Sequence, residues 1–322
     1  MRDILEILAS GEYVSGEKIS AELGISRAAV WKRMETLRSQ GYQIESAGKR
    51  GYRLLPGDGL SPVLWQGALT TRALGRGTVC YEHELTSTNT VLKELAAQGA
   101  PHGSLCLCDL QTAGKGRLGR LWTSPAGEGL WCSVLLRPQL KPQDAPFITL
   151  CTAMALAQAI DELCGTQVRI KWPNDLVLCG KKCCGILTEM AADPDTVEYV
   201  VVGTGINLHP MAYPPELAEK AISLEEAAGR APFRRKLLVR YLAALEPLLD
   251  TLEQQGFAAL AAQYAARSCT LGSRVQVIGS VNLTGQAEAL DDTGALMVRT
   301  NDGVLHRVLS GDVSVRGVMG YV

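Results

Sequence analysis

The sequence has little cysteine and histidine for its length, and it has no long uninterrupted apolar run. Its 10 cysteines among 322 residues make up about 3%, far below the roughly 8–10% typical of disulfide-stabilised secreted domains. Charges at Arg2, Asp3 and Glu6 fall where a signal peptide would need an apolar segment. The most apolar stretch, residues 147–160, contains polar side chains and is shorter than the ~20 residues that span a bilayer. We therefore expect a reduced cytoplasmic protein with no membrane partner.

Several common catalytic and metal-binding patterns are also missing. The phosphate-loop pattern fails because Asp175, not a glycine, stands five residues before Gly180. The G-x-S-x-G pattern of hydrolase nucleophiles does not occur. Cys179, Cys183 and Cys184 lack a second cysteine or histidine pair, and the chain has only 4 histidines, which disfavours a zinc site.

The length and the overall charge set broad limits on what remains. A chain of 322 residues with 47% hydrophobic content predicts two or three domains with buried cores. Lys and Arg number 32 against 33 Asp and Glu, for a formal net charge of −1. No global field therefore attracts nucleic acid or an anionic membrane, and any such binding requires a local patch.

The first 56 residues have the pattern of a winged helix-turn-helix. A short helix from Gly16 ends at Gly24, which suits the left-handed turn after a helix. Ser26 can cap the next helix, expected over 27–40 and closed by Gly41. Residues 42–55 alternate around two glycines, as a two-stranded wing would. Two helices joined by a short glycine-containing turn are typical of a helix-turn-helix.

Local charge suggests that this module binds DNA. Residues 26–53 contain seven basic and two acidic residues, an excess of five. Basic side chains on the third helix and the wing can meet phosphates, and polar groups near that helix's start can reach base edges. We expect Trp31 and Met34 to be core or packing residues and not base readers. A small protein-interaction module with a solvated basic face is the alternative. The DNA-binding candidates are Ser26, Arg27, Lys32, Arg33, Lys49 and Arg50.

The rest of the chain predicts two further regions. Strand-like and helical runs alternate over residues 78–208, which indicates an α/β domain around a mixed sheet, and a helical stretch follows over about 233–267. The last fifty residues contain short strand-like runs separated by turn signals at 291–294 and 301–303. Several short strands with such turns suggest a small barrel. The expected fold class is α+β and multidomain.

Glycine and cation clusters in the middle region indicate an anion pocket. Residues 114–119 match G-x-G-x-x-G, but no helix pattern follows as a dinucleotide fold requires. Instead, three cations stand among glycines, which let backbone amides approach an anion. A flexible basic loop is the alternative for this segment, and an ordinary turn is the alternative for Lys171-Trp-Pro-Asn-Asp175. Further clusters occur at 181–185 and 203–207. Together they describe a pocket for an anionic or nucleotide-bearing ligand.

The same motifs, taken in their order, resemble those of a known family. They are Ser87-Thr-Asn89, Gln111-Thr-Ala-Gly-Lys-Gly-Arg-Leu-Gly-Arg120, Trp122, Lys171-Trp-Pro-Asn-Asp175, Lys182 to Gly185 and Gly203-Thr-Gly-Ile-Asn207. The chain looks like a member of the biotin protein ligase family. With the N-terminal helix-turn-helix and the C-terminal barrel, it resembles the bifunctional ligase-repressors of that family. The resemblance implies three domains: a winged helix-turn-helix over 1–58, a mixed-sheet catalytic domain of biotin/lipoate ligase type over 59–269, and a C-terminal SH3-like β-barrel over 270–322.

The resemblance implies an ATP-dependent, Mg²⁺-assisted ligase. Biotin and ATP form biotinyl-5′-AMP, and the biotinyl group then passes to one lysine of a biotin carboxyl carrier protein of a biotin-dependent carboxylase. Operator DNA and a homodimer of the biotinyl-AMP complex are the other implied partners. A biotin-sensing transcription factor with weak or no ligase activity is the alternative.

The resemblance also assigns roles to residues. Lys182, Arg117 and Asp175 are the implied catalytic residues, and Asp175 either binds Mg²⁺ or receives the attacking lysine's proton. Two departures from the best-known loop, Lys115 and Leu118 in place of arginines, predict weaker retention of the intermediate. The implied biotin contacts are Ser87, Thr88, Asn89, Gln111, Gly114, Lys115, Arg117, Lys182, Gly185 and Gly205. The implied ATP or adenylate contacts are Arg117, Arg120, Trp122, Lys171, Asn174, Lys182, Asn207 and Arg316. Thiols at Cys183 and Cys184 beside Lys182 suggest a site sensitive to oxidation.

Overall fold

The computed structural model describes residues 3–40, 42–55, 57, 59–279, 282–310 and 313–317. The side chains of Lys49 and Arg316 lie outside this description, as do the expected helix end at Gly41 and the expected domain boundary at Asp58. The chain forms two compact units, one of Met1–Thr70 with Phe233–Val239 and one of Thr71–Pro232 with Arg240–Val322.

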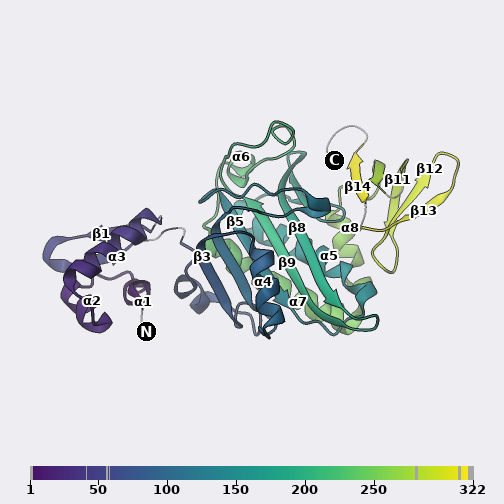
Figure 1. The fold of residues 1–322 in the computed structure, drawn as a ribbon. Helices are drawn as coiled ribbons and strands as arrows, with labels where there is room; N and C mark the ends of the chain where they lie inside the picture. The colour runs from purple at the N-terminus through teal and green to yellow at the C-terminus, as the bar shows by residue number, and fades with distance from the viewer. Residues whose placement is uncertain are drawn as a thin grey trace. The chain divides into compact units, whose positions relative to one another are not determined.

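The first unit contains the predicted winged helix-turn-helix. Its elements are α1 (Ile4–Leu8), α2 (Gly16–Leu23), α3 (Arg27–Ser39), β1 (Ile44–Ser46) and β2 (Tyr52–Leu54). Gly24 ends α2 at φ 64°, and Ser26 caps α3 through the backbone N–H of Ala29. The strands β1 and β2 pair antiparallel around a tight turn (Figure 1), so the predicted wing is confirmed.

The core of this module corrects one prediction. Ile4, Leu8, Ile19, Val30 and Met34 are all buried, as the helical spacing requires. Met34 is fully buried, as expected, whereas Trp31 is 58% exposed. The prediction for Trp31 was wrong because residues 30 and 34 already supply the buried side of α3, and residue 31 lies a quarter turn away from them.

The second unit is built around a seven-stranded mixed sheet. Its strand order is β3-β4-β5-β9-β8-β7-β6, and the β3–β4 pair is parallel while the others are antiparallel. The strand bounds are β3 (Val79–Leu85), β4 (Leu105–Gln111), β5 (Gly129–Leu136), β6 (Arg169–Lys171), β7 (Asp175–Leu178), β8 (Lys181–Ala192) and β9 (Val197–Asn207).

Two helices cover opposite faces of this sheet. The helix α4 (Thr88–Ala97) packs against β4, β5 and β9 (Figure 1), and its Asn89 and Lys93 bond Glu189 of β8. The preceding residue of β8, Thr188, instead contacts Thr149 of α5 (Pro146–Cys164). Because successive side chains of a strand point to opposite faces, α5 covers the face away from α4.

The helix α5 is longer and more apolar than the sequence analysis allowed. Residues Pro142–Cys164 are long and apolar enough to cross a membrane by length and composition, yet 72% of their most apolar window is buried inside the protein. A core helix passes the same test. The helix ends at Gly165, which has the left-handed φ of 72°. The remaining helices are α6 (Leu224–Ala228), α7 (Arg234–Gln255), whose first residues belong to the first unit, and α8 (Ala261–Arg267).

The last fifty residues form a five-stranded antiparallel sheet in the order β13-β12-β11-β10-β14. Among the described residues, the outer strands β13 and β14 do not pair, so the sheet shows no closure into a barrel. The strand β14 is an addition to the sequence prediction. The strand bounds are β10 (Arg274–Gly279), β11 (Leu283–Leu290), β12 (Leu296–Thr300), β13 (Leu305–Val308) and β14 (Val313–Gly317).

Candidate functional site

A pocket lies where α4 begins and where β8 and β9 run side by side. The glycine-rich loop after β4 closes it from one side, and the turn between β6 and β7 closes it from another. Eleven of the predicted ligand residues line it together, although they come from six segments of the chain. The predicted lining residues are Ser87, Thr88, Asn89, Gln111, Lys115, Arg117, Trp122, Asn174, Lys182, Gly185 and Gly205.

Two glycines form the surface on which the Trp122 indole lies. Gly185 of β8 and Gly205 of β9 are direct partners across the two strands. A Cβ atom added at Gly205 would stand 2.3 Å from Trp122 Nε1, and one at Gly185 would stand 2.8 Å from Trp122 Cζ3. No side chain other than hydrogen fits beneath the indole at either position. These glycines are expected to contact biotin and Trp122 to contact adenine, and the structure brings all three together.

The indole leaves little free space in the pocket. The cavity measures about 50 Å³, against the ~300 Å³ or more of usual small-molecule sites. Trp122 Nε1 is buried and has no hydrogen-bond partner within the described part of the chain. The Trp122 side chain, which lies on the glycine pair, therefore occupies part of the space that a ligand of ordinary size needs.

The polar end of the pocket is a hydrogen-bonded set of side chains on α4, β4 and β5. Gln111 Oε1 accepts bonds from the Thr88 backbone N–H (2.9 Å) and hydroxyl (3.3 Å), and Gln111 Nε2 donates to Ser124 Oγ (2.8 Å). Ser133 Oγ lies 2.7 Å from Thr88 Oγ1. These bonds fix the direction of the Gln111 amide, so the pocket presents donors and acceptors in set positions.

Asn89 is held mainly by the protein itself. Its Nδ2 donates to Glu189 Oε2 (2.8 Å), and its Oδ1 lies 2.6 Å from Ser133 Oγ. A Cβ at Gly203 would stand 2.1 Å from Asn89 Oδ1, so that glycine makes room for the amide. Burial would raise the pKa of Glu189, but hydrogen bonds from Lys93 and Asn89 lower it below its ordinary value. The predicted biotin contact by Asn89 stays a prediction, and the structure adds a supporting role beneath the pocket.

Opposite charges meet at the other end of the pocket. Lys182 Nζ lies 2.6 Å from Asp175 Oδ1 and 5.1 Å from the centre of the Trp122 ring. Both charged side chains are mostly buried, where an ion pair is stronger than at the surface. The pairing results from a bulge between β7 and β8, which brings residue 182 alongside residue 177. The ammonium is thus fixed beside the pocket.

The glycine-rich loop places its three cations differently. Arg117 Nη1 donates to Asn174 Oδ1 (2.8 Å), and Arg117 Nη2 also bonds the carbonyl of Ser310 in the C-terminal region. Lys115 and Arg120 are exposed. Leu118, between them, adopts the left-handed conformation at φ 56°, which costs a leucine about 1–2 kcal/mol. The loop is a short 3₁₀ turn, Arg117–Gly119, and not the start of a dinucleotide-binding helix.

Five predicted site residues lie outside the pocket lining. Gly114 is buried where the loop returns, and a Cβ there would stand 2.3 Å from the Trp122 carbonyl. Lys171 is buried in β6, Arg120 is exposed, and Asn207 donates to the carbonyl of Ile222 (3.4 Å). Asp175 reaches the site through Lys182. The side chain of Arg316 lies outside the described residues.

Sequence reasoning missed Ser124, Ser133 and Glu189, which support the pocket from beneath. Single serines and a strand glutamate have no motif, and only the pairing of β5 with β9 and the return of the loop bring them close. The hydroxyl of Ser133, in an otherwise apolar strand, is the one local signal of a buried polar contact.

The cysteines contradict the expected oxidation-sensitive site. Cys183 and Cys184 are fully buried, and burial raises the pKa of Cys183 to about 12 and that of Cys184 well above its ordinary value. The thiolate is the reactive form, so these thiols are inert at neutral pH. A hydrogen bond from Cys106, in contrast, lowers the pKa of the half-buried Cys80 to about 7. All ten cysteines are free.

The donor set fits a magnesium ion that is bound partly through substrate. Among the residues that the structure describes, no three His, Cys, Asp or Glu side chains converge as a metal cage. Mg²⁺ is usually held by one or two carboxylates with substrate phosphates and water. Asp175 supplies one carboxylate at the pocket edge.

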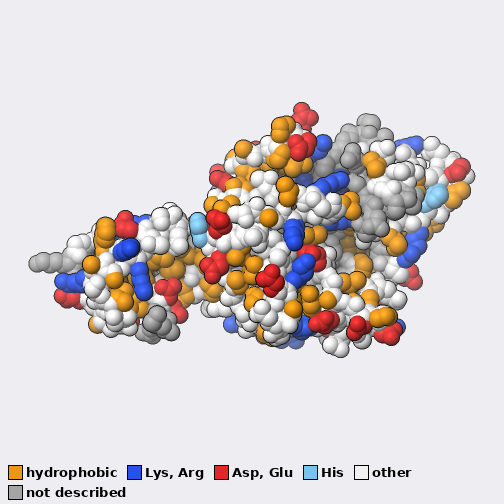
Figure 2. Space-filling view, in the orientation of Figure 1, with side chains coloured by type: hydrophobic (Ala, Val, Ile, Leu, Met, Phe, Trp, Pro, Cys, Tyr) orange, Lys and Arg blue, Asp and Glu red, His pale blue; other side chains and the backbone are white. Residues whose placement is uncertain are grey.

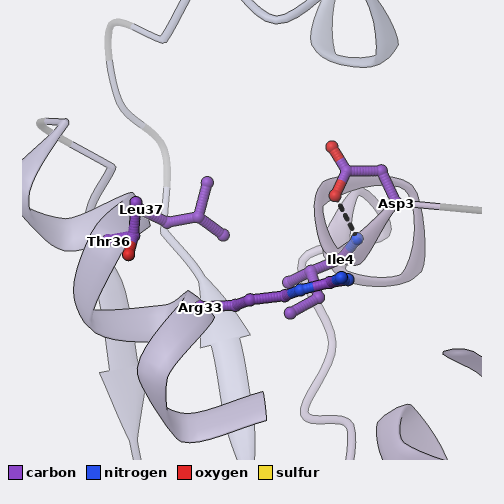
Figure 3. Close-up of a pocket in the computed structure, with 5 residues that line it drawn as sticks. All are labelled: Asp3, Ile4, Arg33, Thr36 and Leu37. Atoms are coloured by element: carbon purple, nitrogen blue, oxygen red, sulfur yellow. Dashed lines mark hydrogen bonds between the residues drawn. The ribbon is translucent and has the colours of Figure 1, made fainter. Parts of the chain in front are cut away.

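The N-terminal unit presents part of its predicted basic surface to solvent. Lys32 and Arg27 are exposed, and Arg27 pairs with Glu17 at 2.5 Å. Figure 2 shows Lys and Arg side chains on the visible face of this unit. Figure 3 shows Arg33 extended toward Ile4 at the start of α1, where it lines a shallow pocket. Arg33 therefore lies on the flank of α3 that meets α1.

Other basic residues of this unit bond within the protein. Arg38 donates to the Ile44 carbonyl (2.8 Å) and pairs with Glu35, and Arg53 pairs with Glu45 at 2.7 Å. The guanidinium of Arg50 stacks on the Tyr13 ring at 3.9 Å. Glu35 and Glu45 pair with Arg38 and Arg53, so the excess of five lies on the other five basic residues of 26–53, of which Arg27 pairs with Glu17 outside that range.

Comparison with protein families matches three parts of the chain. The biotin/lipoate A/B protein ligase family matches residues 82–207, an HTH domain matches residues 1–53, and the biotin protein ligase C terminal domain matches residues 270–316. The order of the three is that of the three regions expected from the sequence.

Comparison with individual proteins gives relatives over nearly the full length. The chain is 39% identical to the bifunctional ligase/repressor BirA of Bacillus subtilis, over 98% of each chain. It is 30% identical to BirA of Escherichia coli, over 97% of this chain and 96% of the relative. The solved biotin protein ligase of Aquifex aeolicus in complex with biotin and ATP is 28% identical, with a TM-score of 0.65, over 74% of this chain and 99% of that chain.

Proposed function

Because the chain belongs to the biotin/lipoate protein ligase family and carries a helix-turn-helix domain in front of the ligase, we propose that the pocket described above is where it activates biotin. The protein is an ATP-dependent biotin protein ligase and a biotin-responsive repressor. The observation that carries the site assignment is the convergence of Gln111, Lys182 and the glycine pair Gly185 and Gly205 in one pocket.

The first step joins biotin to AMP. A carboxylate oxygen of biotin attacks the α-phosphorus of ATP, the bond to the pyrophosphate oxygen breaks, and biotinyl-5′-AMP forms. Two negative groups must approach each other, so fixed positive charge beside them lowers the barrier. Lys182, held by Asp175, supplies that charge, and Arg117 is placed to exchange its bond to Asn174 for one to the carboxylate or phosphate. Mg²⁺ at Asp175 and the phosphates would neutralise further charge.

Biotin recognition follows from the polar end of the pocket. Thr88 and Gln111 have the fixed donors and acceptors that a ureido ring requires, with Ser87 and Asn89 at the same end. Gly114, Lys115, Gly185 and Gly205 complete the predicted biotin contacts. We assign Arg120, Trp122, Lys171, Asn174, Asn207 and Arg316 to the adenylate. Movement of the Trp122 indole from the glycine pair opens the biotin subsite and frees the ring to cover the nucleotide.

The second step transfers the biotinyl group. The amine of an acceptor lysine attacks the acyl carbon of the anhydride, AMP leaves, and the amine loses a proton. As the alternative to holding Mg²⁺, Asp175 at the pocket edge receives that proton. The loop from Lys115 to Arg120 keeps water from the anhydride when it closes. The acceptor is a biotin carboxyl carrier domain of a biotin-dependent carboxylase.

Several finer features are part of this proposal. The C-terminal sheet is an SH3-like barrel, and the three domains span 1–58, 59–269 and 270–322. The protein is cytoplasmic, and the biotinyl-AMP complex is a homodimer that binds a two-fold operator. Ser26, Arg27, Lys32, Arg33, Lys49 and Arg50 contact that DNA. The five-stranded antiparallel order of the C-terminal sheet, with β11 at its centre, supports the SH3-like assignment, and Arg27 at the start of α3 supports the DNA contacts.

Exchange of labelled pyrophosphate into ATP tests the ligase activity. We expect exchange that depends on biotin, followed by labelling of one lysine when a carrier domain is added. Absence of exchange at every substrate concentration contradicts the proposal. Binding to the promoter of the protein's own biotin genes, strengthened by biotin with ATP and weakened by salt, tests the repressor activity.

Lys182→Ala separates chemistry from binding. We expect the adenylation rate to fall by roughly 10²–10³-fold, as for loss of one charge-stabilising donor, while the biotin dissociation constant changes only a few-fold. Single-turnover formation of biotinyl-AMP and equilibrium biotin binding measure the two effects. Lys181→Ala, one residue away, is the control and retains both. Equal losses of rate and affinity in Lys182→Ala would refute the assigned role.

A further inference from the structure

One side of α3 forms an exposed stripe with an aromatic residue at its centre. Val30 and Met34 face the core, whereas the five residues of the stripe are exposed. Trp31, the largest of the exposed set, is 58% exposed. The stripe follows the i, i+1, i+4, i+5, i+8 spacing of one helix face and consists of Arg27, Ala28, Trp31, Lys32 and Glu35.

The position of the stripe matters more than the exposure. The helix α3 is the second helix of the helix-turn-helix, and such a helix places its N-terminal residues against base edges in the major groove. Trp31 is the fifth residue of α3, on the same face as Arg27 and Lys32. Arg27 precedes the indole in the sequence and Lys32 follows it, and these two cations suit a polyanionic partner. A single exposed apolar residue needs no explanation. An exposed indole between two cations, on the helix face that enters the major groove, does need one.

The chemistry of the indole limits what it can recognise. Trp has no acceptor and cannot make the paired hydrogen bonds by which Arg reads guanine or Asn reads adenine. Its main asset is a large apolar surface. The apolar group that a base pair presents in the major groove is the C5-methyl of thymine.

We propose that Trp31 is a specificity-determining residue of the repressor, whose indole packs on a thymine methyl in the operator. Arg27 and Lys32 hold the adjacent phosphates, and the ion pair between Arg27 and Glu17 sets the position of the guanidinium. Ala28, on the preceding turn, leaves space beside the indole for the base edge. This assignment rests on the proposed DNA binding, and it adds which base feature α3 recognises.

The test removes the methyl from the DNA and the indole from the protein. A duplex is selected from a random library by the full-length protein with biotin and ATP, and each thymine is replaced in turn by deoxyuridine. For the wild type, we expect one or two replacements per half-site to weaken binding about three- to tenfold, the worth of one buried methyl group. For Trp31→Ala, the same replacements have no effect, and affinity for the methylated duplex is already reduced. Trp31→Phe, which keeps an aromatic face, retains most of the discrimination.

Two controls separate the outcomes. Lys32→Ala weakens binding to all duplexes, lowers the slope of log affinity against log salt by about 1, and keeps the sensitivity to deoxyuridine. Trp31→Ala retains weak, salt-dependent binding to unrelated duplexes, which shows that the module is folded. If Trp31→Ala responds to deoxyuridine as the wild type does, the inference is overturned while DNA binding stands. If the wild type selects no sequence, both are overturned. If Trp31→Ala loses binding to an added protein instead, the stripe is a protein interface and the inference fails.

Discussion

Single glycines decide what the pocket holds. Gly205 has no room for a Cβ because the atom would stand 2.3 Å from Trp122 Nε1. In Gly205→Ala, we expect the indole to leave its place and the methyl to narrow the biotin subsite, so that biotin binds at least tenfold more weakly, within the cost of overpacking. Tryptophan fluorescence is measured for Gly205→Ala and for the double variant Gly205→Ala with Trp122→Phe. The difference between the two spectra is the emission of Trp122, and it reports whether the indole is displaced. Gly67→Ala, where nothing lies within 4 Å, leaves biotin binding unchanged, and unaltered affinity in Gly205→Ala would contradict the assignment.

Thiol reactivity is a second property of single residues. A hydrogen bond from Cys106 lowers the pKa of Cys80 to about 7, whereas burial raises that of Cys183 to about 12. Cys80 should therefore react with iodoacetamide at a rate that rises through pH 7, because the thiolate fraction rises there. Peptide mapping after short exposures identifies the site, and Cys106→Ala shifts the midpoint upward by removing the donor. Labelling of Cys183 before Cys80 in the folded protein would be the contrary result.

At the scale of elements, periodicity and capping predicted most boundaries. The end of α2 at Gly24 and the start of α3 after Ser26 agree with the sequence because a left-handed glycine and a capping serine are local signals. Trp31 was misplaced, since a hydrophobic residue beside a buried face carries no signal that it faces outward. The Lys182–Asp175 pair was beyond sequence reasoning as well, because it depends on a bulge between two strands.

A turn between β11 and β12 gives an element-scale prediction. Burial would raise the pKa of Asp291, but hydrogen bonds from Arg307, Thr293 and Ala295 lower it to about 2. A carboxyl with a lowered pKa in the folded state adds stability that is complete above its unfolded value near 4 and is lost as pH falls toward 2. Asp291→Asn should lower the free energy of unfolding by on the order of 1–2 kcal/mol at pH 7, after allowance for solvent screening.

Urea unfolding at several pH values checks this turn. The gap between wild type and Asp291→Asn should narrow between pH 5 and pH 2. Asp292→Asn, at the adjacent exposed position, has little effect at any pH. A gap that stays constant with pH would mean that the side chain acts through shape and not through charge.

At the scale of the whole molecule, the Lys171–Asp175 motif links the pocket to the C-terminal region. Asn174 bonds Arg117 on the pocket side, and Trp172 donates through Nε1 to the Gly294 carbonyl (3.1 Å) and through its backbone N–H to Thr270. The motif could be predicted as pocket chemistry, but its second contact could not, because Gly294 lies more than a hundred residues further along the chain. The C-terminal sheet therefore belongs to the structural support of the site.

Gly294→Ala tests that support. Gly294 has φ +78°, and a Cβ there would stand 2.9 Å from Phe147 Cε1, in the ring stack of Phe147 on Phe257. Gly303 also has a positive φ, +85°, but nothing lies within 4 Å of its Cβ position. Both alanine variants lose about 1–2 kcal/mol of unfolding free energy to the left-handed backbone, and Gly294→Ala loses about 1–3 kcal/mol more to overpacking. Because the carbonyl of residue 294 accepts the hydrogen bond from Trp172 Nε1, a shift of that residue also slows pyrophosphate exchange in Gly294→Ala. Gly303→Ala does not slow the exchange. Equal losses of stability in the two variants, with unchanged exchange rates, would show that the C-terminal sheet and the pocket are not coupled through this contact.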